Sequence, residues 1–429
     1  MSSRRTFLAG AGATILSHLP SAKALSANDR IRIAVLGVNG RGNEHLARLA
    51  TLDNVEVAAI CDPDLEVARK RAAEFDQKHD RKVPVVQDLR RVLDDKQIDA
   101  VTIATPNHWH ALATIWACQA GKDVYVEKPG SHNLAEGRRM IEAARKYHRI
   151  VQHGVQLRSS DAIQEAIGHL RSGTIGNVYM ARGLVFRRRP SIGHKGPETA
   201  PATLDFDLWT GPAKLEPFSR RFVHYNWHWT WNYGNGDVGN QGVHETDLCM
   251  WGLGVEGFPS RITAMGGKFL FDDDKQTPEV LSTLFHYPDQ KKMIQFEVRP
   301  WCTNQEDGVE VGNIFYGSEG YLVVNGYSSY AIYLGEKREK GPAREGENPL
   351  TAHFANWIKA VRSRKTEDQN GPVETAHLSA GLAHLGNISY RLGRTLEFDS
   401  AGETFPHDAE ATRMLTREYR APYVVPPSV

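Results

Sequence analysis

Continuous apolar runs and helical patterns alternate along the first third of the chain. The run at residues 31–36 is rich in Ile and Val, which is typical of a strand buried on both faces in a parallel sheet. Comparable runs lie at residues 55–61, 100–104, 123–126 and 150–155. Because helical spacing separates these runs, the pattern predicts a Rossmann domain over residues 28–150.

A period of two replaces this pattern in the second half of the chain. Apolar and polar residues alternate, with turn residues between the segments, at positions 260–271, 281–287, 293–298 and 321–325. Alternation of this kind predicts antiparallel strands with one face exposed or covered by a partner. We therefore expect an α/β protein with an N-terminal Rossmann domain. An α+β domain with a large, mostly antiparallel open sheet should follow at residues 151–395.

Helical spacing marks three further segments of the second domain. They lie at residues 162–171, 353–362 and 378–392. Residues 396–429 are expected to form a C-terminal arm. The Pro- and Val-rich end at 421–429 has no periodicity, and we expect it to dock on a neighbouring subunit.

The N-terminus has the pattern of a targeting segment. Arg4 and Arg5 precede a short apolar run at residues 8–19, and Ala22 and Ala24 follow it. The apolar run is too short to span a bilayer as a helix. The order basic, apolar, small predicts a signal peptide over residues 1–27, and the paired arginines predict the twin-arginine type. We expect export, to the periplasm or otherwise through this pathway, and no transmembrane segment in the mature chain.

Composition narrows the range of partners. The 429 residues include 52 Lys and Arg against 51 Asp and Glu, so no basic surplus favours nucleic acid. The four cysteines lie far apart without metal-ligand spacing, and we interpret them as core residues: Cys61, Cys118, Cys249 and Cys302. No metal site and no disulfide framework is expected.

A glycine-rich turn, Gly37-Val38-Asn39-Gly40-Arg41-Gly42, follows the first predicted strand and leads into a helical pattern. Strand, tight turn and helix N-terminus form the setting in which backbone N–H groups bind a dinucleotide pyrophosphate. Asn39 stands where the second glycine of the usual motif is expected, and Asn tolerates unusual backbone angles. Taken alone, the motif is equally open to interpretation as a plain glycine turn.

An acidic residue ends the second predicted strand. Asp62 lies 25 residues after Gly37, where a carboxylate can bind the adenine ribose hydroxyls. Pro63 and Asp64 follow it, and the negative charge would repel the extra phosphate of NADP. This arrangement favours NAD, while the nearby Arg41 keeps NADP possible.

Two further strands end in polar segments. These are Thr105-Pro106-Asn107-His108-Trp109-His110 and Glu127-Lys128-Pro129. Together with the glycine turn, and at this spacing, they resemble the Gfo/Idh/MocA oxidoreductase family, over nearly all of the chain after residue 27. The resemblance implies these cofactor-binding residues: Gly37, Asn39, Gly40, Arg41, Gly42, Asp62, Thr105, Pro106, Asn107, His110, Glu127 and Lys128. It also implies that Lys128 reaches the nicotinamide ribose and the substrate hydroxyl, and helps the proton leave.

The segment at residues 234–247 resembles the family's glycine-rich approach to an Asp-x-Gly-x-His-x-x-Asp helix. The resemblance places His244 at the catalytic histidine, and imidazole exchanges protons near neutrality. Asn240 stands where the family has aspartate; on a helix it would share a face with His244, but it cannot ionise. We therefore expect Lys128 and His244 to carry the acid–base chemistry and Asn240 to orient. Asp237 is a candidate to compensate for the missing carboxylate.

Five aromatic residues nearly alternate before this segment: Tyr225, Trp227, Trp229, Trp231 and Tyr233. An extended chain would put them on one face, either as a platform for the C–H faces of sugars or as core packing. His228 has the opposite parity and receives no role. The predicted substrate-binding residues are Gln156, Arg158, Trp229, Asp237 and Asp247.

Three functions follow from these features. The first is an NAD(P)-dependent oxidoreductase for a secondary alcohol of a sugar or polyol, with a tightly held cofactor because free cofactor is scarce outside the cytoplasm. The second is a redox-neutral NAD-dependent glycoside hydrolase that works by transient oxidation and elimination. The third is a non-catalytic nucleotide-binding scaffold. In each case we expect a homo-oligomer formed through the open sheet.

Overall fold

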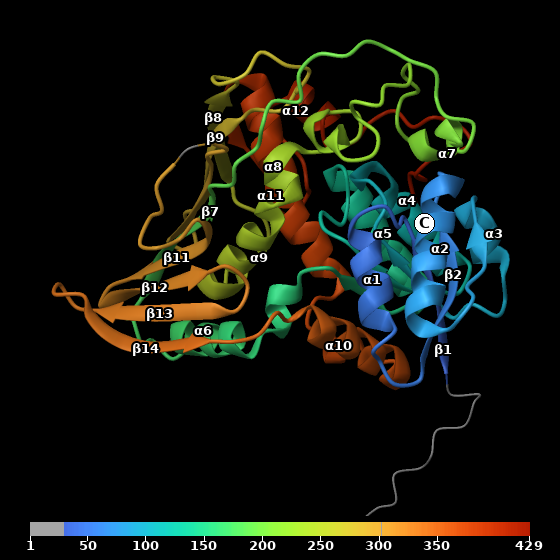
Figure 1. The fold of residues 1–429 in the computed structure, drawn as a ribbon. Helices are drawn as coiled ribbons and strands as arrows, with labels where there is room; N and C mark the ends of the chain where they lie inside the picture. Colours follow the sequence, from blue (N-terminus) through green and yellow to red (C-terminus); the bar gives the residue numbers. More distant parts are fainter. Residues whose placement is uncertain (1–29, 302) are drawn as a thin grey trace, which may run out of the picture.

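A six-stranded parallel sheet forms the centre of the first domain in the computed structural model, which describes residues 30–301 and 303–429. Its strand order is β3-β2-β1-β4-β5-β6 (Figure 1). The strands are β1 Ile31–Leu36, β2 Val55–Cys61, β3 Val85–Val86, β4 Ala100–Ile103, β5 Asp123–Val126 and β6 Val151–His153. This order is that of a dinucleotide-binding Rossmann sheet, so the predicted Rossmann domain is confirmed.

Helices cover both faces of this sheet, as the β1 sequence requires. Ile33 and Val35 point into a cluster with one set of helices, whereas Ala34 and Leu36 point into a cluster with another. The helices of the domain are α1 Arg41–Leu49, α2 Leu65–His79, α3 Leu89–Asp94, α4 Asn107–Gln119 and α5 Leu134–Lys146. With both faces buried, the carboxyl edge of the strands remains for ligand contact.

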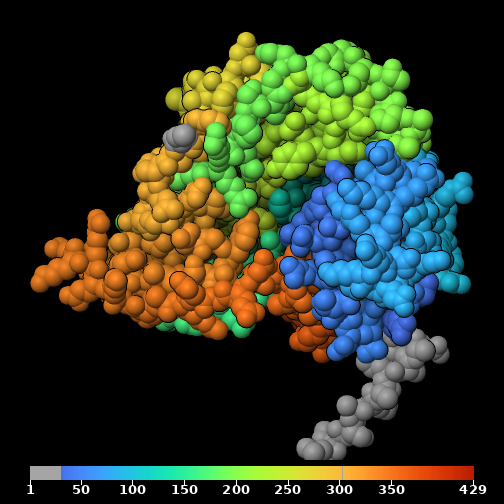
Figure 2. All heavy atoms as spheres, viewed as in Figure 1, coloured from blue at the N-terminus to red at the C-terminus, as the bar shows by residue number. Residues whose placement is uncertain are grey.

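The second domain contains a nine-stranded sheet in the order β14-β13-β12-β11-β7-β10-β9-β8-β15. Its strands are β7 Val178–Val185, β8 Arg261–Gly267, β9 Val280–Tyr287, β10 Lys292–Val298, β11 Val311–Gly317, β12 Gly320–Asn325, β13 Ser329–Leu334, β14 Glu339–Glu345 and β15 Leu396–Glu397. Only β7 and β10 pair in parallel, so the expected large and mostly antiparallel sheet is confirmed. Figure 2 shows the hairpins that end in β14 projecting away from the Rossmann domain.

One face of the large sheet packs on helices. Ile262, Phe285 and Phe296 lie in a common core with Leu248 of α9 and Leu385 of α11. The helical segments of this region are η2 Gln156–Ser159, α6 Asp161–Arg171, α7 Phe206–Thr210, η3 Asn226–Trp229, α8 Gly236–Asn240, α9 Gly242–Leu253, α10 Leu350–Ser363, η4 Thr366–Asp368, α11 Val373–Leu392 and α12 Ala409–Arg413. Helix α9 therefore lies between the large sheet and the Rossmann domain, where its side chains can reach a shared site.

The two domains are less separate along the chain than the division at residues 150 and 395 implies. Phe354 and Trp357 of α10 are fully buried against Ile33 and Leu49 of the Rossmann domain. Apolar side chains of α10 pack on the part of the first sheet that α1 and α2 do not cover. A segment from the second half of the chain therefore completes the core of the first domain.

The C-terminal segment packs on its own chain, while its docking on a neighbouring subunit stays a prediction. Tyr423 is buried, and its ring contacts Trp109 and Trp116 of α4 with centroids 5.5 and 6.4 Å apart. Val425 belongs to the same cluster. The chain end therefore lies on the Rossmann domain (Figure 1), because α4 offers an aromatic surface there.

The predicted signal peptide at residues 1–27 lies outside the described residues, as does Cys302. Cys61, Cys118 and Cys249 are buried free thiols, as expected of core residues. Within residues 30–301 and 303–429, no helix has the length and apolar character needed to cross a membrane.

Candidate active site

A cavity of about 360 Å³ opens where the carboxyl edge of the first sheet faces α8, α9 and the segment after β7. Eleven of the twelve predicted cofactor-binding residues line it: Gly37, Asn39, Gly40, Arg41, Asp62, Thr105, Pro106, Asn107, His110, Glu127 and Lys128. The predicted catalytic residues Asn240 and His244 line it as well. The structure thus brings residues from four strand ends and from the second domain into one site.

The glycine turn has no space for side chains at its two ends. Gly37 has a φ of +80°, and a Cβ atom there would lie 2.8 Å from the carbonyl oxygen of Ala104. A Cβ on Gly42 would lie 1.8 Å from the carbonyl oxygen of Gly37. Gly42 does not line the cavity; it lets α1 start directly behind the turn. Backbone N–H groups at the start of α1 can therefore approach a pyrophosphate closely, so the turn fits a dinucleotide.

Asp62 lies in the cavity wall beside the glycine turn. Its carboxylate accepts hydrogen bonds from the backbone N–H groups of Val38, at 2.9 Å, and Asp64, at 3.0 Å. These bonds fix the carboxylate beside the glycine turn. The Arg41 guanidinium points elsewhere, because its Nε donates to Glu127 Oε1 at 2.8 Å. Arg41 is thus engaged away from Asp62, whereas Arg71 of α2 donates hydrogen bonds to the carbonyl oxygens of Val38 and Asn39 beside the turn.

Glu127 is a buried carboxylate held by two partners. Its Oε1 atom lies 2.8 Å from Arg41 Nε and 3.1 Å from His45 Nε2. Burial alone would raise the pKa of Glu127, but the Arg41 charge, the His45 contact and the Lys128 charge together outweigh this effect and hold the pKa well below its usual range. Glu127 therefore remains ionised and orients the start of α1 relative to β5.

The turn after β4 meets the Glu-Lys-Pro turn through His110. The two ring nitrogens of His110 lie 2.7 Å from the Thr105 carbonyl oxygen and 2.6 Å from that of Pro129. The Thr105 hydroxyl is buried in the cavity wall without a hydrogen-bond partner in the described chain. An unpartnered hydroxyl in this position fits a ligand that supplies the missing bond.

Lys128 extends from the end of β5 towards the second domain. Its Nζ donates a hydrogen bond to the main-chain carbonyl oxygen of Asn240. Burial lowers the pKa of Lys128 to about 8, although the Glu127 charge opposes this shift. Lys128 can therefore give or take a proton near neutral pH.

His244 lies in the first turn of α9 and lines the same cavity as Lys128. Burial, reinforced by the Lys128 charge, holds the pKa of His244 well below its usual range, so the imidazole is neutral. Its Nδ1 is buried without a hydrogen-bond partner in the described chain, and the ring stands edge-on to Tyr327 with centroids 5.3 Å apart. A substrate hydroxyl is a suitable partner for the free nitrogen.

The helix predicted to carry both Asn240 and His244 is interrupted. Helix α8 ends at Asn240, and α9 begins at Gly242, where a Cβ atom would lie 2.3 Å from the Phe296 ring. The chain bends at Gln241 so that α9 can pack closely on β10. Both side chains still line the cavity, but the Asn240 backbone carbonyl becomes available to Lys128.

Three predicted substrate-binding residues lie outside the cavity wall in ion pairs. Asp237 accepts two hydrogen bonds of 2.8 Å from Arg189, and it lies 3.4 Å from the Asn240 amide nitrogen. It therefore holds Arg189 rather than replacing the missing aspartate. Arg158 forms a two-pronged pair with Asp247, at 2.7 and 3.0 Å. Of the predicted set, only Gln156 lines the cavity, with its Oε1 buried and unpartnered in the described chain.

The aromatic segment is not extended, so its side chains do not share one face. Residues 226–229 form the short helix η3, which turns Trp227 into a core with Trp209 and Tyr233. Trp229 is buried under Arg189 and does not line the cavity. The wall is formed instead by Tyr225, Trp227 and His228. His228, which parity had excluded, stacks on Trp227 with ring centroids 3.6 Å apart.

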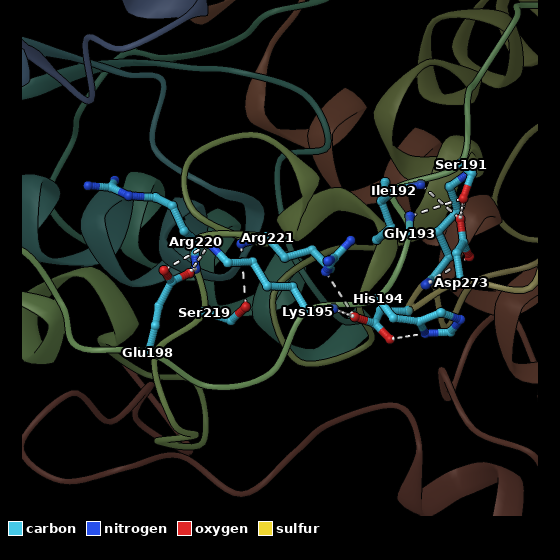
Figure 3. Close-up of polar contacts among 12 residues, drawn as sticks. Ser191, Ile192, Gly193, His194, Lys195, Glu198, Ser219, Arg220, Arg221 and Asp273 are labelled. Carbon is cyan, nitrogen blue, oxygen red and sulfur yellow. Dashed lines mark hydrogen bonds and ion pairs between the residues drawn. The ribbon is translucent and has the colours of Figure 1, made fainter.

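Arg187 and Arg189 reach the cavity from a segment that the sequence had not marked. This segment follows β7 and continues as an irregular strap over residues 186–205. Figure 3 shows how carboxylates anchor the strap: Asp273 accepts from Ser191 Oγ at 3.1 Å and from the Ile192 N–H at 2.9 Å. The run of three arginines at residues 187–189 was the available sequence signal.

The chain is similar in sequence or in fold to several known proteins. The chain is similar to an inositol 2-dehydrogenase of Salmonella typhimurium (31% identical over 180 residues, 42% of this chain and 52% of that protein). It is also similar to glycosyl hydrolase family 109 protein 1 of Shewanella sp. (31% over 170 residues, 33% and 37%). The chain thus spans about half or less of the length of these relatives. The solved WlbA dehydrogenase of Bordetella pertussis, in complex with NADH and UDP-GlcNAcA, has the same fold (TM-score 0.65, 19% identity, 86% and 99% covered).

The fold and the site define a two-domain enzyme that binds a nicotinamide dinucleotide. Residues 31–155 match the oxidoreductase family model with an NAD-binding Rossmann fold, and residues 192–425 match the model of the family's C-terminal alpha/beta domain. The chain belongs to the Gfo/Idh/MocA oxidoreductase family, as the sequence motifs indicated, and its cofactor is NAD.

Proposed function

We propose that the protein oxidises a secondary alcohol of a sugar or polyol to a ketone, and catalyses the reverse reduction, with a tightly held NAD. The observation that carries this proposal is the position of Lys128. Its amine lies in the cavity wall beside His244 and near the coenzyme turn, and burial lowers its pKa to about 8. Alcohol oxidation needs a base of this kind beside the hydride acceptor.

In this reaction bound NAD supplies the acceptor for the hydride that leaves the alcohol carbon. The neutral amine of Lys128 takes the hydroxyl proton as the carbon–oxygen double bond forms. The Asn240 carbonyl oxygen accepts a hydrogen bond from Lys128 Nζ and so orients the amine. His244 stays neutral and offers its unpartnered ring nitrogen to a substrate hydroxyl.

The aromatic part of the cavity wall supports the proposed substrate class. Trp227 and His228 present stacked rings to the cavity, and flat rings of this kind suit the C–H faces of a sugar. Gln156 adds a buried amide oxygen without a partner in the described chain, which can accept a bond from a hydroxyl. The relatives named inositol 2-dehydrogenase add support from outside the structure.

The test is a screen of the purified, NAD-loaded protein against polyols, aldoses and glycosides, with nicotinamide reduction as the signal. Lys128→Met is the matched control because it keeps the length of the side chain and removes the amine. The proposal predicts reduction by at least one polyol or sugar in the wild type, and loss of that signal in the variant. A wild type that binds NAD but reduces it with none of these compounds would refute the proposal.

A redox-neutral glycoside hydrolase is the second candidate. It is favoured by the similarity to glycosyl hydrolase family 109 protein 1, and the same residues would serve it. Here NAD would oxidise the sugar transiently, and the hydride would return after elimination of the glycosidic bond and addition of water. Product analysis separates the two: a cleaved glycoside without net NADH supports hydrolysis, whereas an intact oxidised sugar supports dehydrogenation.

We further propose that residues 1–27 direct export through the twin-arginine pathway, which carries folded proteins and would let NAD be loaded first. The support is the order of charged, apolar and small residues in the sequence. Fractionation of cells that express the full chain tests this, with Arg4→Lys/Arg5→Lys as the comparison. Export of the wild type but not of the variant is expected; equal distribution would contradict it.

The outer face of the large sheet is the surface we propose for self-association. Met265 of β8 is 78% exposed and Leu284 of β9 is 39% exposed. Leu284 pairs with Thr263, two residues before Met265, so both side chains share the face opposite the helices. Light scattering should show an oligomer that Met265→Asp/Leu284→Asp disrupts. A monomeric wild type would contradict this assignment.

A further inference from the structure

A second cavity, of about 590 Å³, lies outside the coenzyme site. The segment 231–235, the C-terminal halves of α11 and α12, and the tail at 416–420 form its wall. No described residue lines both cavities. Its volume is in the range of cavities that hold small molecules.

Positive charge dominates the wall of this second cavity. Lys214, Arg391, Arg413, Arg417 and Arg420 line it, against a single acidic residue, Glu418. Arg420 pairs with Asp207. The other four cations form no ion pair with any residue in the described ranges. Like charges that outnumber the acidic residues around one cavity repel each other, and a bound anion would relieve this repulsion.

Arg417 shows that the charge is fixed in place and not merely solvated. Its guanidinium donates hydrogen bonds to the carbonyl oxygens of Asn232, at 2.9 Å, and Pro212, at 3.1 Å, and to His132 Nδ1, at 3.1 Å. All three acceptors are neutral. Burial lowers the pKa of Arg417, although the charge of Glu136 opposes this shift. The protein therefore holds this cation at the edge of the cavity without an ion pair in the described part of the chain.

Two buried polar atoms in the wall lack protein partners in the described chain. His132 Nδ1 accepts from Arg417, so the neutral ring carries its proton on Nε2, which is buried and unpartnered. Asn387 is 5% exposed, and its Oδ1 is also unpartnered. One free donor and one free acceptor in the same wall match a ligand with several oxygen atoms.

Trp231 supplies a flat surface in the same wall. The Arg391 guanidinium lies 5.0 Å from the centre of its ring. The cation lies over one face of the indole, so a sugar ring that contacts the rest of Trp231 would bring an acidic substituent to Arg391. Arg413 and Lys214 are exposed and line the same cavity.

We propose that this second cavity binds an anionic sugar, that is, a sugar ring bearing a carboxylate, sulfate or phosphate group. Trp231 contacts the ring, Arg391 and Arg413 bind the acidic group, and Asn387 and His132 bind hydroxyls. The site is independent of the proposed dehydrogenase reaction. Asn235 of its wall also accepts a 3.0 Å hydrogen bond from Asn107 of the coenzyme cavity, so the two sites are adjacent.

Calorimetric titration of the NAD-loaded full chain tests the proposal. The probes are glucuronate, glucose 6-sulfate and glucose 6-phosphate, with neutral glucose and inorganic sulfate for comparison. We expect at least one acidic sugar to bind at least about tenfold more tightly than glucose or inorganic sulfate, because ion pairs to arginine strengthen binding. Which of the three acidic sugars binds identifies the acidic group.

Variants locate the binding. Arg391→Gln/Arg413→Gln should weaken binding of the acidic sugar at least about tenfold. Arg171→Gln, which removes an exposed charge at the end of α6, should leave it unchanged. NAD content and thermal unfolding of each variant show that it is folded. Absence of binding by every acidic sugar, equal binding of inorganic sulfate or glucose, or undiminished binding to the folded double variant would each overturn the proposal.

Discussion

Lys128 donates a hydrogen bond from Nζ to the main-chain carbonyl oxygen of Asn240. The contact joins the Rossmann domain to α8 across the cavity. A backbone oxygen holds the lysine, whatever side chain stands at position 240. The break between α8 and α9 exposes that oxygen.

Removal of the lysine amine should stop the reaction without emptying the coenzyme site. We expect Lys128→Met to lower kcat by about 10² to 10⁴-fold, the usual contribution of a positioned base. NAD content should stay near that of the wild type, because the glycine turn and Asp62 are unchanged. Measurement of kcat together with NAD released on denaturation checks this. A variant that loses both in parallel would show a structural role instead.

The pH dependence follows from the direction of the Lys128 shift. Burial lowers its pKa to about 8, so the amine is charged below that pH and neutral above it. Only the neutral amine accepts a proton. Alcohol oxidation should therefore rise with pH through about 8, and ketone reduction should fall over the same interval. The residual activity of Lys128→Met should lack this pH dependence. The same dependence in that variant would assign the titration to another group.

The Asn240 side chain should matter less than its backbone. Asn240→Ala keeps the carbonyl oxygen that Lys128 uses and removes only the amide, whose bond to Asp237 is 3.4 Å long. We expect kcat to fall less than about tenfold, well below the effect of removing a base. Steady-state kinetics of this variant beside Lys128→Met decide the matter. Losses of similar size in both would mean that the amide itself takes part in the reaction.

How far the sequence predicted the structure is clearest from the strand ends. Buried apolar runs lead into residues of the site, namely Gly37, Asp62, Thr105 and Lys128. Because parallel strands end at the same edge of the sheet, the sequence predicted that these residues meet in one cavity. The bend at Gln241 was not predicted, because it depends on the close contact between Gly242 and Phe296 from a distant strand.

The aromatic segment shows the opposite case. Alternation of Tyr225, Trp227 and Trp229 predicted a shared face only for an extended chain, and η3 turns them to different environments. His228 was excluded by parity and yet lines the cavity. Local period is a weak guide where tertiary packing, here against Trp209, sets the backbone.

Arg158 and Asp247 should act on stability rather than on substrate binding. Their two-pronged pair is outside the cavity wall, and the Asp247 side chain is 4% exposed. Arg158→Ala leaves a buried charge unpaired and should cost about 3–5 kcal/mol of unfolding free energy. Arg171 is exposed and forms no ion pair in the described chain. Arg171→Ala should therefore change the free energy of unfolding by less than about 0.5 kcal/mol. Urea unfolding measures both, and an unchanged KM at low temperature is expected. A raised KM with unchanged stability would restore Arg158 as a substrate ligand.

The most direct test of the central claim is a single-turnover experiment on the NAD-loaded protein. The protein is mixed with the best polyol or sugar from the screen, carrying deuterium on the oxidised carbon, and the reduced nicotinamide is followed and then analysed by mass. The account predicts a burst of reduced cofactor that carries the deuterium, in the wild type and not in Lys128→Met. Substrate turnover without deuterium ever reaching the nicotinamide would contradict hydride transfer at this site.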